Sequence, residues 1–170
     1  MAKLTLKVKK VAQKNIHAYV YGEHGDTSFI PWSLADISGC HLSEFEDLMI
    51  KRGVVTERVD PEKTLHYVQK SGGEIIAKKG ATFYAVSVSV MKILKKLTAA
   101  YDSFATVSSL MHGEYGVEDV CMSTLALIGP DGYRGKVLVD LTDEEVEKMK
   151  ASAEALKASP CPKRLKALAT

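Results

Sequence analysis

The chain is 170 residues long, with 46% hydrophobic and 26% charged residues, proportions that are ordinary for a globular domain. This length fits a single domain over residues 1–170, large enough to bury a core. The formal net charge of +2 gives no indication of a nucleic-acid or acidic-membrane partner.

Short elements are predicted at the start of the chain. The lysine-rich segment Leu4–Gln13 predicts a short helix. Ile16–Tyr21 is a β-branched and aromatic run, which predicts a strand that ends at a turn on Gly22. A second extended segment is expected over Ser28–Trp32, where Pro31 restricts it to the edge or the end of a sheet.

Three helices are predicted next. The segment Ser43–Lys51 predicts a short helix, with Ser43 as its cap and a glutamate three residues later. Pro61 stands in the first-turn position that proline tolerates and opens a long helix. Gly80 is expected to break this helix, and apolar residues at helical spacing predict another helix over Thr82–Leu97.

The last third of the chain predicts a sheet and a closing helix. Strands are expected over Thr106–Met111, Asp119–Ile128 and Lys136–Asp140, with Asp131-Gly132 forming a hairpin turn between the last two. Residues 142–145 read as a capping box, which opens a helix. The buried stripe of this helix is predicted to be Val146, Met149, Ala153 and Leu156.

This order of elements predicts an α+β fold with an antiparallel sheet and long helices. A Rossmann-type nucleotide-binding domain would need strands that alternate with crossover helices. That alternation is missing from the pattern, and none of the twelve glycines stands in a G-x-G-x-x-G spacing. We therefore expect no dinucleotide-binding domain within this sequence.

The cysteines give no indication of disulfide or metal chemistry. Cys40, Cys121 and Cys161 are widely spaced and form no C-x-x-C pair, so neither a disulfide framework nor a zinc site is predicted. The five histidines also lack a ligand pair at zinc spacing. No apolar stretch is long enough to span a bilayer or to resemble a signal peptide. A cytoplasmic location without membrane association is the simplest expectation.

His24 is the strongest candidate for chemistry. It follows a predicted strand and lies in residues 22–27, Gly-Glu-His-Gly-Asp-Thr, where a polar side chain can reach a cleft. Histidine exchanges a proton near neutral pH, which suits general acid–base catalysis. From the spacing alone, a hydrogen-bonded loop histidine with no catalytic role is the favoured interpretation.

Several segments resemble bacterial L-lactate dehydrogenases of the lactate/malate dehydrogenase family. Asn15–Thr27 followed by Pro31–Ser33 resembles the active-site strand and loop of those enzymes. Lys79–Tyr84 resembles the helix junction at their substrate pocket, and Met111–Gly116 together with the helix from Thr142 resembles their carboxy-terminal strands and last helix. The resemblance implies that family's carboxy-terminal, substrate-binding domain, and the interconversion of pyruvate and L-lactate with NAD.

The resemblance also assigns roles to four residues. His24 matches the proton donor that protonates the keto oxygen as hydride arrives. Thr82 matches a residue beside the substrate, although its hydroxyl could instead cap a helix. Val86 matches an apolar contact to the nicotinamide ring, although core packing is an alternative. His17 matches the phosphate-binding histidine of members activated by fructose 1,6-bisphosphate, although a strand histidine that binds no ligand is the favoured interpretation.

Gly72 is a further candidate for the substrate pocket. Adjacent glycines at positions 72 and 73 cost a helix interior about 1 kcal/mol each relative to alanine. The family usually has small residues such as alanine here, on a helix that lines the pocket. The two glycines therefore predict a pocket wide enough for a 2-oxo acid larger than pyruvate, with close helix packing as the alternative explanation.

The mechanism that the resemblance implies needs more groups than this sequence supplies. An aspartate that orients the histidine, two arginines and the NAD-binding domain all match positions upstream of Met1. We therefore expect a separate NAD-binding half as a partner, an inactive isolated chain, and exposed apolar patches that favour a homo-oligomer. A malate or branched-chain 2-hydroxy-acid dehydrogenase and a non-catalytic fragment or interaction module are the alternatives.

Overall fold

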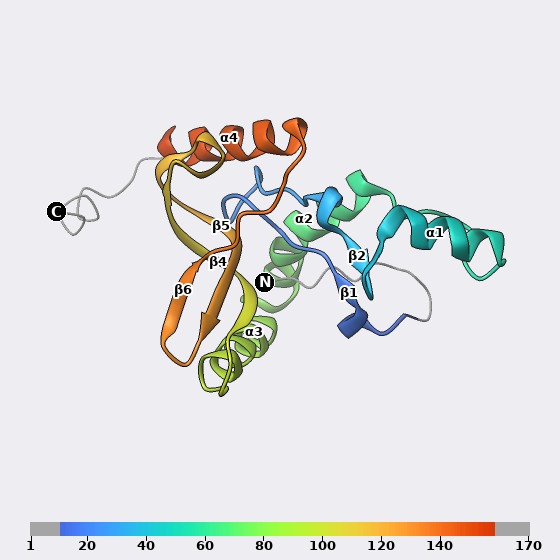
Figure 1. The fold of residues 1–170 in the computed structure, drawn as a ribbon, viewed down its shortest axis with the longest axis horizontal. Helices are drawn as coiled ribbons and strands as arrows, with labels where there is room; N and C mark the ends of the chain where they lie inside the picture. The colour runs from blue at the N-terminus through green and yellow to red at the C-terminus, as the bar shows by residue number, and fades with distance from the viewer. Residues whose placement is uncertain (1–10, 159–170) are drawn as a thin grey trace.

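The computed structural model describes residues 11–158 of the chain, which form two antiparallel sheets and four α-helices (Figure 1). The smaller sheet has the order β1-β2-β3, with strands Ile16–His17, Asp36–Ile37 and Cys40–His41. The larger sheet has the order β4-β5-β6, with strands Ser103–His112, Glu118–Gly129 and Gly132–Lys136. The helices are α1 (Leu42–Lys51), α2 (Pro61–Lys79), α3 (Tyr84–Leu97) and α4 (Asp143–Ala158).

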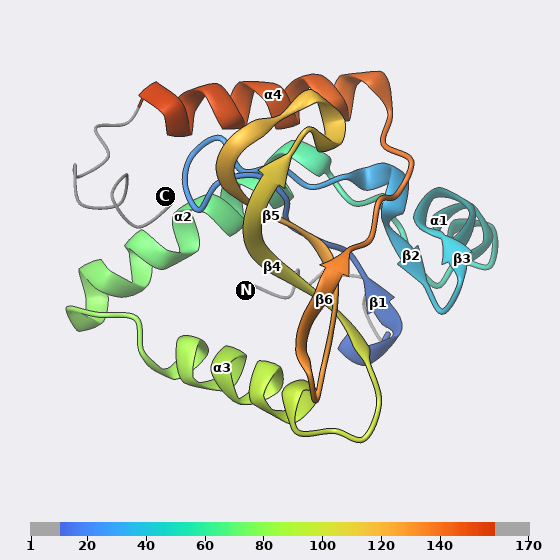
Figure 2. The same ribbon diagram turned by 60° about the vertical axis from the view of Figure 1, so that its left-hand side comes forward.

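The two sheets lie on different sides of the molecule and have separate cores. Figure 2 shows α4 across the top of the larger sheet, α2 and α3 to its left and below, and α1 with the small sheet to the right. Ile16, Ile37 and Leu42 belong to the core at the small sheet. Met122 and Met149 belong to the second core, between the larger sheet and α4. All strand pairs in the described residues are antiparallel, which confirms the predicted α+β fold.

The predicted strand Ile16–Tyr21 is much shorter than expected. Only Ile16 and His17 pair in the small sheet, and Tyr21 makes an isolated bridge with Phe29. Ile16 is buried in one core and Tyr21 in the other. The chain crosses between the two cores over residues 18–20, so this apolar run cannot stay in one ladder. Residues 32–34, at the end of the second predicted extended segment, form a 3₁₀ turn.

The final predicted strand, Lys136–Asp140, is also wrong. The strand β6 ends at Lys136, and its tight turn lies at residues 130–131, one position before the predicted one. Beyond it, the Tyr115 hydroxyl lies 2.9 Å from the carbonyl oxygen of Val139 and 3.0 Å from its backbone nitrogen. A side chain thus takes the place of a neighbouring strand, which satisfies the backbone without extending the ladder.

The helices confirm most of the predicted signals. Asp60 caps α2 by accepting a hydrogen bond from the Lys63 backbone, and Gly80 ends it with φ +78°. The helix α1 begins one residue early, and its cap is the His41 side chain rather than Ser43. Glu46 accepts a bond from the Val59 backbone instead of closing a capping box. The predicted helix over Leu4–Gln13 lies largely outside the described residues.

The capping box of α4 forms as predicted. The Glu145 backbone donates to Thr142 Oγ1 at 3.3 Å, and the Thr142 backbone donates to Glu145 Oε2 at 3.1 Å. Burial would raise the pKa of Glu145, but hydrogen bonds from Ser33 and Thr142 outweigh that effect and lower it. Met149 and Ala153 of the predicted stripe are fully buried. The hydrogen bonds from Ser33 to Glu145 fix the start of α4 against the segment that follows residues 22–28.

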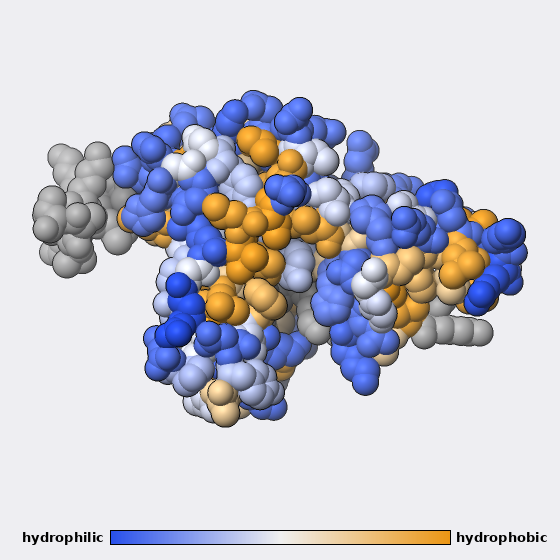
Figure 3. Space-filling model, in the orientation of Figure 1, coloured by the Kyte–Doolittle hydropathy of each residue, from blue (hydrophilic) through white to orange (hydrophobic). Residues whose placement is uncertain are grey.

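Apolar side chains also remain on the surface. Figure 3 shows hydrophobic side chains gathered in the middle of one face, below α4. Neither α2 nor α3 has a residue buried by the rest of the described chain, and several apolar side chains of α3 are about half exposed. They are Val86, Val88, Val90, Met91 and Leu94, and Tyr84 is more exposed still. No helix within residues 11–158 is long and apolar enough to cross a membrane.

Candidate active site

His24 lies at the exposed tip of a loop whose two ends are tied together. The backbones of Tyr21 and Phe29 exchange hydrogen bonds of 2.9 and 3.0 Å and close the loop at its base. Both of these side chains are buried in the larger core, and their rings meet edge to face. Residues 24–27 between them are exposed, and His24 is among these. The loop therefore presents an imidazole to the outside from a rigid base.

Gly22 joins this loop to the larger sheet. Its backbone exchanges hydrogen bonds of 3.2 and 2.9 Å with Ser123 of β5. Its φ of +94° is one that L side chains rarely adopt, and a Cβ at this position would lie 2.7 Å from Ser152 Oγ. Glycine is thus required by both the backbone conformation and the close approach of α4.

The side of the loop that faces α4 is held by Ser152. The Glu23 backbone donates a hydrogen bond to Ser152 Oγ at 2.9 Å. Thr27 Oγ1 lies 3.1 Å from the same oxygen and 2.6 Å from Glu23 Oε1. The Glu23 carboxylate also accepts a bond from the Thr27 backbone at 3.1 Å. These contacts join the residues on both sides of His24 to the last helix.

The opposite side of the loop is held by α2. Gln69 Nε2 donates to the carbonyl oxygens of Asp26 and Ser28 at 2.8 and 2.9 Å. Lys70 Nζ lies 3.0 Å from Asp26 Oδ1. Sequence reasoning missed Ser152, Gln69 and Lys70, because contacts between residues this far apart in the chain leave no local pattern. The one available signal was a serine next to the predicted apolar stripe of α4.

Both carboxylates next to His24 in sequence are therefore engaged elsewhere. Glu23 binds Thr27, and Asp26 pairs with Lys70. Within residues 11–158, the His24 side chain makes no hydrogen bond or ion pair. An imidazole in this setting can deliver or accept a proton at a reacting oxygen, but the described residues supply no carboxylate to fix its tautomer.

The other predicted site residues lie on different elements. Gly72 is in the middle of α2, three residues after Gln69, so it lies one turn beyond the contact with the His24 loop. A Cβ on Gly72 would meet no described atom within 4 Å, so close helix packing does not explain this glycine here. Thr82 lies in the link between α2 and α3 rather than on a helix, and Val86 is half exposed in the first turn of α3. His17 is exposed at the end of β1.

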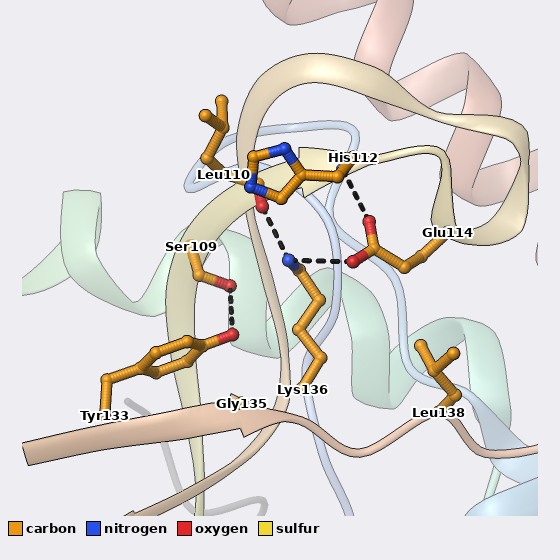
Figure 4. A pocket seen from close by; sticks show the side chains of 8 residues that line it. All are labelled: Ser109, Leu110, His112, Glu114, Tyr133, Gly135, Lys136 and Leu138. Carbon is orange, nitrogen blue, oxygen red and sulfur yellow. Dashed lines mark hydrogen bonds and ion pairs between the residues drawn. The ribbon is translucent and has the colours of Figure 1, made fainter. Parts of the chain in front are cut away.

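A separate cavity lies between β4 and β6, and His24 does not line it. It is an open pocket of about 520 Å³, and Figure 4 shows its lining. The lining residues are Ser109, Leu110, His112, Glu114, Tyr133, Gly135, Lys136 and Leu138. Lys136 Nζ lies 3.0 Å from Glu114 Oε1, and the lysine side chain is almost fully buried. This cavity holds an internal ion pair rather than the predicted chemistry.

The ion pair with Lys136 is one of the causes that change the pKa of Glu114. Burial would raise the pKa of Glu114, but the His112 backbone N–H, 2.6 Å away, and the Lys136 ammonium outweigh it. The pKa of Glu114 is thereby lowered to about 2. Among residues 11–158, no group of three histidine, cysteine or acidic side chains is arranged to hold a metal ion.

Comparisons with known proteins agree with the resemblance read from the sequence. The model of the lactate/malate dehydrogenase alpha/beta C-terminal domain matches residues 2–161. The L-lactate dehydrogenase of Acetivibrio thermocellus is 38% identical over 148 residues, which cover 87% of this chain and 46% of that protein. L-lactate dehydrogenase 1 of Peribacillus psychrosaccharolyticus is 39% identical over 147 residues, which cover 86% and 45%.

Solved structures agree with the fold. An L-lactate dehydrogenase from Clostridium thermocellum superposes with a TM-score of 0.74 at 33% identity, covering 86% of this chain and 46% of that one. A malate dehydrogenase from Archaeoglobus fulgidus, in complex with NADH, superposes with a TM-score of 0.68 at 31% identity, covering 84% and 42%. The chain thus spans about half the length of the curated relatives it matches.

Proposed function

Because this chain belongs to the lactate/malate dehydrogenase family, through the C-terminal α/β domain of that family, we propose that it provides the catalytic and substrate-binding half of an NAD-dependent L-lactate dehydrogenase. The observation that carries this proposal is the His24 loop. Its imidazole is exposed, while contacts to β5, α2 and α4 hold the backbone around it. Such an arrangement suits a group that must meet a substrate in a fixed position.

In this proposal His24 is the general acid for reduction of a 2-oxo acid. When bound, NADH supplies hydride to the carbonyl carbon. His24 donates its ring proton to the carbonyl oxygen, so the carbonyl becomes a hydroxyl, and the reverse reaction returns the proton to the ring. The carboxylate that orients the imidazole and the arginines that bind the substrate come from outside the described residues, since Glu23 and Asp26 have other partners.

Two further residues fit the substrate and the cofactor in this proposal. Thr82 lies in the link between α2 and α3, and its half-buried side chain would contact the 2-oxo acid. Val86 fits the nicotinamide ring, because its apolar side chain is half exposed at the start of α3. All strand pairs among residues 11–158 are antiparallel, so these residues offer no parallel-sheet cradle for the phosphates. A nucleotide-binding half completes the site in this proposal.

We favour pyruvate over oxaloacetate, because the curated relatives named above are L-lactate dehydrogenases. A homo-oligomer and a cytoplasmic location belong to the same proposal. The exposed apolar side chains of α3 support self-association, since such patches commonly pack against a partner. His17, exposed at the end of β1, is the residue that we propose for phosphate binding in an activated oligomer.

The test is a fusion of the full chain to the remaining amino-terminal part of the Acetivibrio thermocellus L-lactate dehydrogenase. NADH oxidation is followed at 340 nm with pyruvate and with oxaloacetate. We expect turnover with pyruvate and a kcat/KM for oxaloacetate that is at least about tenfold lower. Preference for oxaloacetate would replace the lactate proposal with a malate one. Oxidation with neither substrate, in a fusion that binds NADH, would contradict the proposed function.

A further inference from the structure

Ser152 is the most buried polar group near the His24 loop. Its exposed fraction is 0%, although it lies on α4, 129 positions away from Glu23 in the chain. The buried face of α4 on which it lies also carries Glu145, Met149 and Ala153. A buried hydroxyl costs stability unless it is hydrogen-bonded. Within residues 11–158, every hydrogen-bond partner of Ser152 Oγ belongs to the loop that carries His24.

Each hydroxyl group has only one proton, and this determines which group donates in each of these hydrogen bonds. Thr27 has one hydroxyl proton, which goes to the carboxylate of Glu23, since that oxygen is 2.6 Å away and a charged acceptor is preferred. The Ser152 proton is then free to point at Thr27 Oγ1, 3.1 Å away. The backbone N–H of Glu23 donates back to Ser152 Oγ at 2.9 Å. The three residues thus form a closed ring, in which each hydrogen bond polarises the next.

Two residues of this ring lie on either side of His24 in the sequence. Glu23 is the residue before it and Thr27 is three residues after it, so both ends of the tip are attached to one oxygen on α4. Gln69 holds the next part of the loop from the other side, through Asp26 and Ser28. The ring of His24 itself has no hydrogen-bond partner in residues 11–158. Its place is therefore set by its backbone, and the backbone is set by these contacts.

We propose that Ser152 is a positioning residue for His24, which couples the docking of the last helix to the geometry of the proton donor. The proposal rests on the proposed function for its catalytic consequence. Its structural consequence, a loop fixed by Ser152, can be measured without any turnover. Removing the hydroxyl leaves the Glu23 N–H without its acceptor and Thr27 Oγ1 without a donor, at a site that α4 partly shields from water.

The first measurement uses the 170-residue chain alone. Hydrogen exchange of the Glu23 and Thr27 amides and the line width of the His24 imidazole Cε1–Hε1 signal are compared in the parent, Ser152→Ala and Ala153→Gly. Ala153 is the matched control, because it is buried on the same helix but makes no bond to the loop. We expect exchange at Glu23 to rise about tenfold in Ser152→Ala only, with a broadened or shifted His24 signal. Unchanged exchange, or an equal change in Ala153→Gly, would overturn the proposal.

The second measurement uses the fusion enzyme described above. We expect Ser152→Ala to lower kcat about 10- to 100-fold, because a misplaced proton donor acts on the transition state. The KM for pyruvate and the kcat of Ala153→Gly should stay within about twofold of the parent. Normal kcat in Ser152→Ala, despite faster exchange, would overturn the positioning role. An inactive parent fusion would contradict the proposed function instead, and the His24 signal in the isolated chain would then decide the proposal.

Discussion

Asp26 is paired with Lys70, and the two charged atoms, Oδ1 and Nζ, lie 3.0 Å apart. Asp26 is only two positions from His24 in sequence, which would make it an obvious partner for the imidazole if spacing alone decided. Its carboxylate instead joins the loop to α2, next to the bonds that Gln69 makes to the same loop. Asp26 thus makes a structural contact, and the ion pair is largely exposed.

This assignment predicts a small effect for Asp26→Asn. Exposed ion pairs contribute about 0–1 kcal/mol, so the free energy of unfolding should fall by no more than about 1 kcal/mol in urea titrations. In the fusion enzyme, kcat should stay within about threefold of the parent, because Gln69 still binds the loop backbone. The charge-preserving variant Asp26→Glu is the control. A loss of kcat near that of a His24 variant would show that Asp26 orients the imidazole after all.

The second prediction concerns acid stability and Glu114. The pKa of this group is lowered to about 2 in the folded chain from an ordinary value of 4.5, so folding favours the charged form. The resulting stabilisation is present above about pH 4.5 and is lost as the pH falls toward 2, in total on the order of 2 kcal/mol. Urea titrations at pH 7, 4.5 and 3 should therefore show a flatter pH dependence in Glu114→Gln than in the parent. Glu118→Gln, on the same hairpin, is the control, and equal slopes in the parent and Glu114→Gln would refute this.

The third prediction concerns Gly72. Because no described atom lies within 4 Å of a Cβ there, Gly72→Ala should stabilise the isolated chain by up to about 1 kcal/mol through helix propensity. In the fusion enzyme it should lower kcat/KM for 2-oxo-4-methylpentanoate about tenfold more than for pyruvate. Gly73→Ala is the matched control, since Gly73 is equally open but more exposed. If the ratio of the two kcat/KM values does not change, Gly72 does not set the width of the pocket.

The fourth prediction is self-association of the isolated chain through α3. Met91 and Leu94 are about half exposed on a helix that has no buried residue, so they should pack against a second copy. Sedimentation velocity should show dimers or larger species at micromolar concentration. The double variant Met91→Lys, Leu94→Lys should shift the distribution to monomer, whereas Ser108→Lys on β4 should not. A parent chain that sediments only as monomer contradicts the prediction.

The sequence predicted the fold best where one local signal determines an element. The structure confirms the start of α2 at Pro61, its end at Gly80 and the capping box at Thr142, because each depends on residues within one helical turn. The errors occur where a distant side chain replaces a local partner. Tyr115 bonds the backbone of Val139 and ends the expected last strand early.

In the candidate site, too, local signals could be predicted from the sequence and long-range contacts could not. His24 could be found from its motif, because the glycines, acids and histidine are contiguous. The residues that hold the loop could not be predicted, since Ser152 and Gln69 reach it only when α4 and α2 pack against it. Spacing alone left the partners of the two carboxylates in the motif undetermined. Their actual partners, Thr27 and Lys70, became visible only in three dimensions.

The most direct test of the central claim, that His24 is the proton donor, is the steady-state rate of pyruvate reduction by the fusion enzyme with His24→Asn. Asparagine keeps a similar size and polarity but cannot deliver a proton. Binding of NADH, measured by its fluorescence, should be unchanged, while kcat/KM for pyruvate should fall about 10²–10⁴-fold. Asp26→Asn, assayed in parallel, should retain most of the activity. A His24→Asn enzyme that reduces pyruvate within about threefold of the parent rate would contradict the account.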